Sequence, residues 1–348
     1  MIELHNDSLD FSFPEVDAGA WLRVRLRRTL RIPDDGRNYP LPPGLERFPL
    51  RHVDDFAARL PDEWVRHGGV MLPMYQSEAL WLEFRSSWYP FAVKVATGKI
   101  NAVTGERWRE GLHRDPQDYL VVPPQPWLDG YCAENGSVRQ FVAMPLGAGY
   151  TAEEQITGEA EQGGLQIIVF PIKREVLKRI VAEYMESLKE SGAYHGDGDD
   201  EDWDLASFFT VCGADPSSAM GIGAGGRIKQ QIYKDPHKLE DWDLDVSSRC
   251  FVHIANSLVW RAITGSEPPM VPLTSEEYTR AGLPWFSYYA EEQTAVDGSR
   301  TLMRMKSVFQ LGLEKGDVPL PENQSVETNH VIGLTEKPSP LRVREGRF

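Results

Sequence analysis

An alternation of apolar and polar residues near the start of the chain predicts a β-strand. Between residues 21 and 32, Leu22, Val24 and Leu26 alternate with arginines. A period of two is typical of a strand with one buried face, and the other face here would carry a row of guanidinium groups. The turn residues at 33–36, Pro-Asp-Asp-Gly, then end the strand.

Further short apolar segments continue this β-rich texture as far as residue 170. We expect extended structure at residues 9–13, 70–84, 119–122, 138–144 and 165–170, and a hairpin formed by 91–95 and 99–103. Proline and glycine separate the segments, and no helix of adequate length lies between consecutive strands. The pattern therefore favours an antiparallel sandwich or barrel-like arrangement over an alternating α/β fold.

Residues 173–189 carry the clearest helical pattern. Apolar side chains recur there at helical spacing and form one stripe, while lysine and glutamate fill the other face. The stripe consists of Val176, Leu177, Ile180, Val181, Tyr184, Met185 and Leu188. We expect it to dock on the β-rich part or to bridge to the next part.

An acidic run at residues 195–204, HGDGDDEDWD, divides the chain because six carboxylates without a lysine or arginine cannot enter an apolar core. The expected fold is α+β. A mainly antiparallel β-sandwich or barrel-like N-terminal part with a docked amphipathic helix precedes a smaller mixed α/β C-terminal part. We expect a β-rich domain at 1–190, an acidic linker at 191–205, a mixed domain at 206–315 and a flexible tail at 316–348.

Composition narrows the classes of partner and compartment. The 348 residues carry a net charge of −15, which disfavours nucleic acid and anionic membrane surfaces as partners. The three cysteines, Cys132, Cys212 and Cys250, form no CxxC pair, so we expect neither a disulfide framework nor a zinc site, and a cytoplasmic location. No secretory signal or membrane-spanning segment is visible. No cofactor is expected.

The segment Gly221-Ile-Gly-Ala-Gly-Gly226 matches the G-x-G-x-x-G pattern of dinucleotide-binding turns. Residues 214–220 before it predict a loop rather than the buried strand that this motif requires. A flexible glycine loop is therefore the favoured interpretation. In the alternative, Gly221, Gly223 and Gly226 cradle an anion that Arg227 and Lys229 reach.

Two other features are candidates for binding. Residues 123–130, PPQPWLDG, form a stiff loop in which Trp127 either holds a partner or plugs the space under a proline-rich turn. The basic row could face an acidic surface of another copy, but we expect it to pair with glutamates on the neighbouring strand. The row comprises Arg23, Arg25, Arg27, Arg28 and Arg31.

We expect ordinary structural roles for the remaining carboxylates, histidines and cysteines. The loop 147–164 is rich in glutamate, and we expect it to be solvated. The pentapeptide Glu-Asp-Trp-Asp-Leu occurs at 201–205 and 240–244, with flanks that do not match. The acidic run lacks the glycine and glutamate of a calcium loop. Cys250 and His253 fall on opposite faces of a strand, so they form no nucleophile pair.

Two hypotheses for function remain open, and no catalytic residue is assigned. The preferred one is a non-catalytic binding or assembly protein, with a protein partner or a second copy of the chain. It rests on the lack of a coherent catalytic set and on the stiff Trp127 loop. The alternative is an enzyme that acts on a phosphorylated or carbohydrate substrate, with an anion at 221–229 and proton transfer by carboxylates such as Glu154, Glu159 or Asp241.

Overall fold

The computed structural model describes residues 1–86, 88–191, 219–288, 293–318 and 323–334. The acidic run, the first copy of the repeated pentapeptide, Cys212 and the last residues of the predicted tail, 335–348, lie outside these residues. The predicted fold class is confirmed, because the chain is α+β with a mainly antiparallel sheet and a small second sheet. Within the described residues, no helix is both long and apolar enough to cross a membrane.

The main sheet has 17 strands, and the second has two parallel strands, β18 (Trp285–Tyr288) and β19 (Val331–Leu334). The strands of the main sheet are β1 (Ile2–His5), β2 (Ser8–Ser12), β3 (Trp21–Thr29), β4 (Asn38–Tyr39), β5 (Gly44–Arg47), β6 (Arg51–His52), β7 (Val70–Met74), β8 (Ala79–Ser86), β9 (Phe91–Thr97), β10 (Ile100–Asn101), β11 (Leu120–Val122), β12 (Trp127–Leu128), β13 (Gly130–Glu134), β14 (Ser137–Pro145), β15 (Leu165–Pro171), β16 (Ala219–Ile228) and β17 (Ser248–Asn256).

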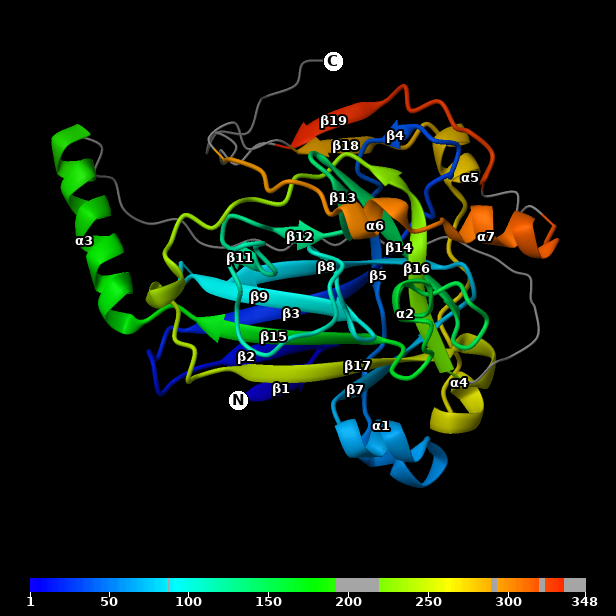
Figure 1. Cartoon of the computed structure of the whole chain (residues 1–348), viewed down its shortest axis with the longest axis horizontal. Coiled ribbons are helices and arrows are strands. Elements are labelled where there is room, and N and C mark those ends of the chain that lie inside the picture. Colours follow the sequence, from blue (N-terminus) through cyan, green and yellow to red (C-terminus); the bar gives the residue numbers. More distant parts are fainter. Residues whose placement is uncertain (87, 192–218, 289–292, 319–322, 335–348) are drawn as a thin grey trace, which may run out of the picture.

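Nine strands of the main sheet pair antiparallel in the order β1–β2–β3–β8–β14–β16–β17–β15–β9. Figure 1 shows β9, β15 and β17 running alongside one another, with β16 crossing their direction. The sheet curls, since Phe13 after β2 packs against Phe91 of β9 with ring centroids 5.8 Å apart. Strands from both sides of the acidic run thus share one sheet, while the predicted domain boundaries in residues 192–218 lie outside the described residues.

Strand β3 shows why the alternating pattern forms a strand here. Its apolar positions, Leu22, Val24 and Leu26, are fully buried in the main core. On the neighbouring strand β8, Glu83 accepts from Arg27 at 2.7 Å and pairs with Arg25 at 3.4 Å. Two arginines of the row therefore pair with a glutamate of the adjacent strand, as we expected. Arg23 pairs instead with Asp10 of β2, and Arg28 pairs with Glu78 just before β8.

Apart from α3, the helices are short, and they lie around the sheet (Figure 1). They are α1 (Asp62–His67), α2 (Ala152–Thr157), α3 (Arg174–Ser191), α4 (Ser257–Thr264), α5 (Ser275–Arg280), α6 (Arg300–Arg304) and α7 (Val308–Lys315), with 3₁₀ turns η1 (Asp54–Arg59) and η2 (Leu239–Asp241). The start of α3 docks as predicted, because Val176 and Leu177 join the main core. Farther along, Val181 is exposed, and the helix projects from the body of the molecule.

Candidate functional site

A cavity of about 210 Å³ opens where segments from five places in the sequence meet. Strand β8 contributes Trp81, and the segment around β12 contributes Trp127 and Asp129. The β4–β5 connection is held to β18 by a pair of backbone hydrogen bonds between Leu41 and Phe286, of 2.8 and 2.9 Å. The lining consists of Leu41, Pro42, Gly44, Trp81, Trp127, Asp129, Phe286 and Leu334. We refer to this cavity as the aromatic pocket.

Two indole rings form the wall of the pocket. Trp81 and Trp127 meet edge to face, with centroids 5.9 Å apart, and Trp127 also packs against Tyr288 at 5.0 Å. Gly44 lies so close behind Trp81 that a Cβ atom there would be 2.6 Å from Cζ2 of the indole. A side chain at position 44 would therefore displace this wall, which explains why glycine occupies it.

Trp127 is neither a fully exposed anchor nor a buried plug, because its side chain is half-buried and lines the pocket. Its position is held by strand pairing with Glu83 and by Gln125, whose Nε2 donates to the Trp127 carbonyl oxygen at 3.0 Å. A ring fixed in this way offers apolar area to a ligand with little loss of conformational entropy.

Asp129 is the titratable side chain of the pocket lining, and it is only 3% exposed. Its backbone N–H donates to Gln230 Oε1 at 3.0 Å, and Gln230 Nε2 donates to Asp129 Oδ2 at 2.7 Å. Within the described part of the chain, Oδ1 accepts no hydrogen bond and no lysine or arginine pairs with the carboxyl. Burial raises the pKa of Asp129 to about 7, and the Gln230 hydrogen bond offsets part of the rise.

A second, much smaller depression adjoins the aromatic pocket and shares Leu41 and Trp127 with it. Lys229, Gln230, Gln231, Tyr233 and Tyr288 also line it. The structure thus brings together two of the residues that we singled out from the sequence, Trp127 and Lys229. Lys229 is exposed.

The glycine segment is not a loop, so that prediction is wrong. Gly221, Gly223 and Gly226 lie in β16, which pairs antiparallel with β14. Packing explains the glycines, since a Cβ at Gly223 would be 2.8 Å from the Tyr150 carbonyl oxygen and one at Gly226 would be 2.4 Å from that of Pro33. The proposed binding role of these glycines stays a prediction.

Arg227 follows the glycines in β16 but does not join Lys229 at the depression. Its guanidinium pairs with Glu134 of β13 at 3.2 Å. The glycines, Arg227 and Lys229 therefore do not converge on one cavity that the structure describes.

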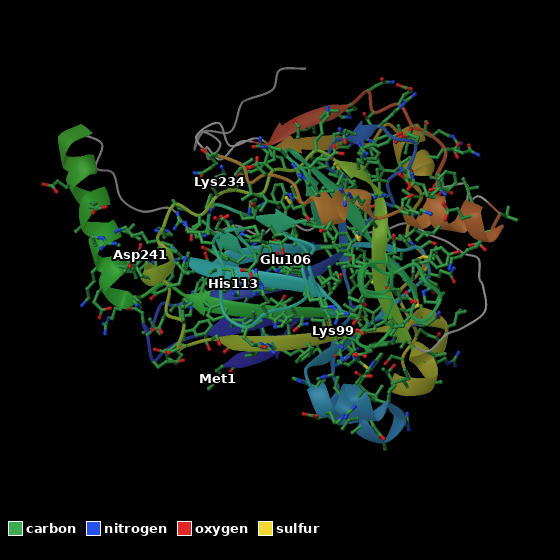
Figure 2. All side chains as sticks on the ribbon, in the orientation of Figure 1. Met1, Lys99, Glu106, His113, Lys234 and Asp241 are labelled. Atoms are coloured by element: carbon green, nitrogen blue, oxygen red, sulfur yellow. The ribbon has the colours of Figure 1, made fainter. Side chains whose placement is uncertain are left out.

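The carboxylates considered for proton transfer hold local structure instead. Glu154 completes the capping box of α2 with Thr151, so the loop 147–164 contains a helix. Glu159 pairs with Arg107 at 3.4 Å. Asp241 pairs with Arg179 of α3 at 3.3 Å, and Figure 2 shows it beside that helix. No three His, Cys, Asp or Glu side chains of the described ranges gather as metal ligands would.

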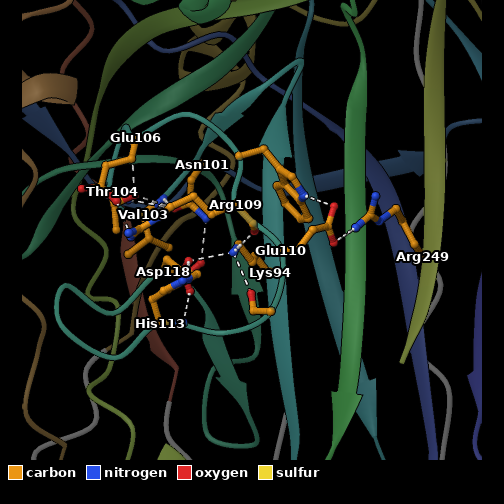
Figure 3. A network of polar contacts seen from close by, with 12 residues as sticks. Lys94, Asn101, Val103, Thr104, Glu106, Arg109, Glu110, His113, Asp118 and Arg249 are labelled. Carbon is orange, nitrogen blue, oxygen red and sulfur yellow. Dashed lines mark hydrogen bonds and ion pairs between the residues drawn. The ribbon is translucent and has the colours of Figure 1, made fainter. Parts of the chain in front are cut away.

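A separate polar network is centred on Lys94 of β9 (Figure 3). Its ammonium donates to Asp118 Oδ2 at 2.7 Å and to the carbonyl oxygens of Arg109 and Gly111 at 2.6 and 2.8 Å. His113 Nδ1 lies 2.9 Å from the same Asp118 oxygen. All three ammonium hydrogens have acceptors, so the network fastens the loop after β10 to the sheet.

No family model matches this sequence, and neither a curated protein nor a solved structure gives a significant match. Sequence reasoning found Trp127 but missed Trp81, Asp129 and Phe286. The signal for Asp129 was its place two residues after Trp127 in the proline-rich loop; Trp81 and Phe286 sit in strands whose patterns give no sign of a cavity.

Proposed function

We propose that the protein is a non-catalytic binding protein whose aromatic pocket holds a compact organic group. The observation that carries this proposal is the pocket itself, an indole-walled cavity with a single carboxyl group in its lining. Binding sites combine apolar and aromatic walls with a few polar groups that orient the ligand, which matches this lining.

The lining favours recognition over catalysis. The pKa of about 7 at Asp129 would suit a general base. Acid–base or nucleophilic catalysis also needs a second group within reach of the reacting atoms. The other lining residues that the structure describes are aliphatic, aromatic, proline or glycine, and none supplies such a group.

The alternative of an enzyme with an anion at 221–229 receives less support. A phosphate cradle needs backbone amides that converge at a turn before a helix. In this chain the glycines lie in an extended strand, and the two basic residues after them point to different surroundings.

A reducing compartment such as the cytoplasm fits the cysteines of the described part, and we include it in the proposal. Cys132 and Cys250 are both buried free thiols, and burial raises the pKa of each to about 12. Thiols of this kind are uncharged and unreactive at neutral pH.

Ligand-observed NMR with a set of compact molecules, from benzene to indole in size, tests the proposed function. We expect saturation transfer to a subset of these molecules, and its loss in a Trp127→Ala variant. Trp88→Ala is the matched control, because Trp88 is 61% exposed and does not line the pocket. Equal binding by both variants, or no binding by the unaltered protein, would refute the proposal.

A further inference from the structure

We propose that the ligand of the aromatic pocket is a small organic cation, an ammonium group on a compact carbon frame, with Asp129 as its counter-ion. This inference rests on the proposed binding function and names the class of ligand. Three features of the structure carry it: an unpaired buried carboxyl group, the indole walls, and the way in which the protein accommodates its own buried ammonium group.

The first feature is the missing partner of Asp129. Among the other buried carboxylates of the described residues, Glu78 pairs with Arg28 at 2.6 Å and Asp118 pairs with Lys94 at 2.7 Å. Glu153 accepts from the backbone N–H groups of Gln162 and Gly163. Asp235 is instead held by several hydrogen bonds, from the Tyr119 hydroxyl, the Trp242 indole and a backbone N–H.

Asp129 has neither arrangement, because one amide donor from Gln230 is its side-chain partner within the described ranges. A buried charge is normally paired, so a carboxylate at a cavity wall with a free oxygen leaves room for an external cation. A bound organic cation would supply the missing charge, and its N–H or O–H group, such as the hydroxyl of choline, would supply the missing donor.

The second feature is the ring content of the walls. Trp81, Trp127 and Phe286 line the same small space as Asp129. The face of an aromatic ring attracts a cation, most strongly when the ring is indole and water is excluded. A purely apolar ligand would use the rings but would leave the carboxyl group buried without a partner.

The third feature is a precedent within this chain. The ammonium of Lys94 lies 4.8 Å from the ring centroid of Trp108. It also pairs with Asp118, as Figure 3 shows. The protein thus surrounds a buried ammonium group with one indole, one carboxylate and two backbone carbonyl oxygens. The aromatic pocket presents an indole and a carboxylate around an open space.

Volume and charge context favour a free small molecule. A cavity of about 150 Å³ is large enough for benzene, so one of about 210 Å³ takes a compact ammonium compound and little more. Lys229 is the positively charged residue in the lining of the adjoining depression. It is exposed to solvent, which screens its effect on the buried carboxyl group.

Calorimetric titration with choline and with its uncharged isostere, 3,3-dimethylbutan-1-ol, tests the inference. At about pH 8 the carboxyl group of Asp129 is mostly ionised. We expect choline to bind at least about tenfold more tightly than the isostere. Asp129→Asn should remove this preference, whereas Glu15→Gln, at an exposed position, should leave it unchanged. Trp127→Phe should weaken choline binding less than Trp127→Ala does.

The outcomes separate this inference from the proposed function. Equal or tighter binding of the isostere would overturn the cation assignment and leave the pocket as a binding site. Binding of neither compound would also overturn it, and the set of neutral molecules described above then decides the function independently. Tighter binding of a peptide that carries trimethyllysine would overturn the assignment to a free small molecule.

Discussion

Replacing Asp129 with asparagine should make the protein more stable, and increasingly so as the pH rises. Burial raises the pKa of this carboxyl group to about 7 in the folded protein, whereas the ordinary pKa of an aspartate in an unfolded chain is 3.8. Between these two values the folded state holds a proton that the unfolded state has released. The free energy of unfolding of the unaltered protein therefore falls with rising pH, by about 1.4 kcal/mol per pH unit.

The total effect follows from the separation of the two pKa values. About three pH units correspond to about 4 kcal/mol, reached when the pH exceeds 7 and constant above it. Asparagine has nearly the same shape and can accept the hydrogen bond from Gln230, but it carries no charge to bury. The free energy of unfolding of the variant therefore lacks this pH-dependent loss. The difference in the free energy of unfolding between the variant and the unaltered protein isolates the contribution of Asp129.

Urea denaturation at a series of pH values measures this difference. Between pH 5 and pH 8 the variant should gain about 3 kcal/mol relative to the unaltered protein. Among the described residues, no other titratable side chain lines the pocket. The adjoining depression contains Lys229, Tyr233 and Tyr288, whose effects on the free energy of unfolding are the same in both proteins and cancel in the difference. Glu15→Gln serves as the control. A difference that stays flat with pH would refute the reasoning about Asp129.

Three further predictions concern other parts of the fold. Gly226→Ala should destabilise the protein by about 1–3 kcal/mol in chemical denaturation, because the new Cβ meets a backbone carbonyl, whereas Gly19→Ala has more room and should be tolerated. Lys94→Met should lower the free energy of unfolding by about 3–5 kcal/mol, since it leaves Asp118 buried without its cation. A loss below about 1 kcal/mol, comparable to that of the exposed Lys238→Met, would contradict this role. Sedimentation velocity should reveal self-association that weakens with added salt, and a monomer at every ionic strength would rule out the predicted assembly.

The β-rich fold was predictable because its signals are local. Leu22, Val24 and Leu26 alternate with arginines within a few residues, and the helical stripe that begins at Val176 repeats within two turns. The same reasoning failed at Gly221–Gly226, because glycine has no side chain to reveal a period. Only the neighbours Tyr150 and Pro33, distant in sequence, show why glycine is needed in that strand.

The sequence by itself determined where strands such as β3 and the start of helix α3 form, since hydrophobic period and turn residues act over short stretches of chain. It also determined the excess of acid. The tertiary structure alone decided that Trp81, Trp127 and Phe286 surround Asp129, because these residues come from segments up to about two hundred positions apart. The raised pKa of Asp129 arises from the same event, because desolvation depends on what packs around a group and not on its neighbours along the chain.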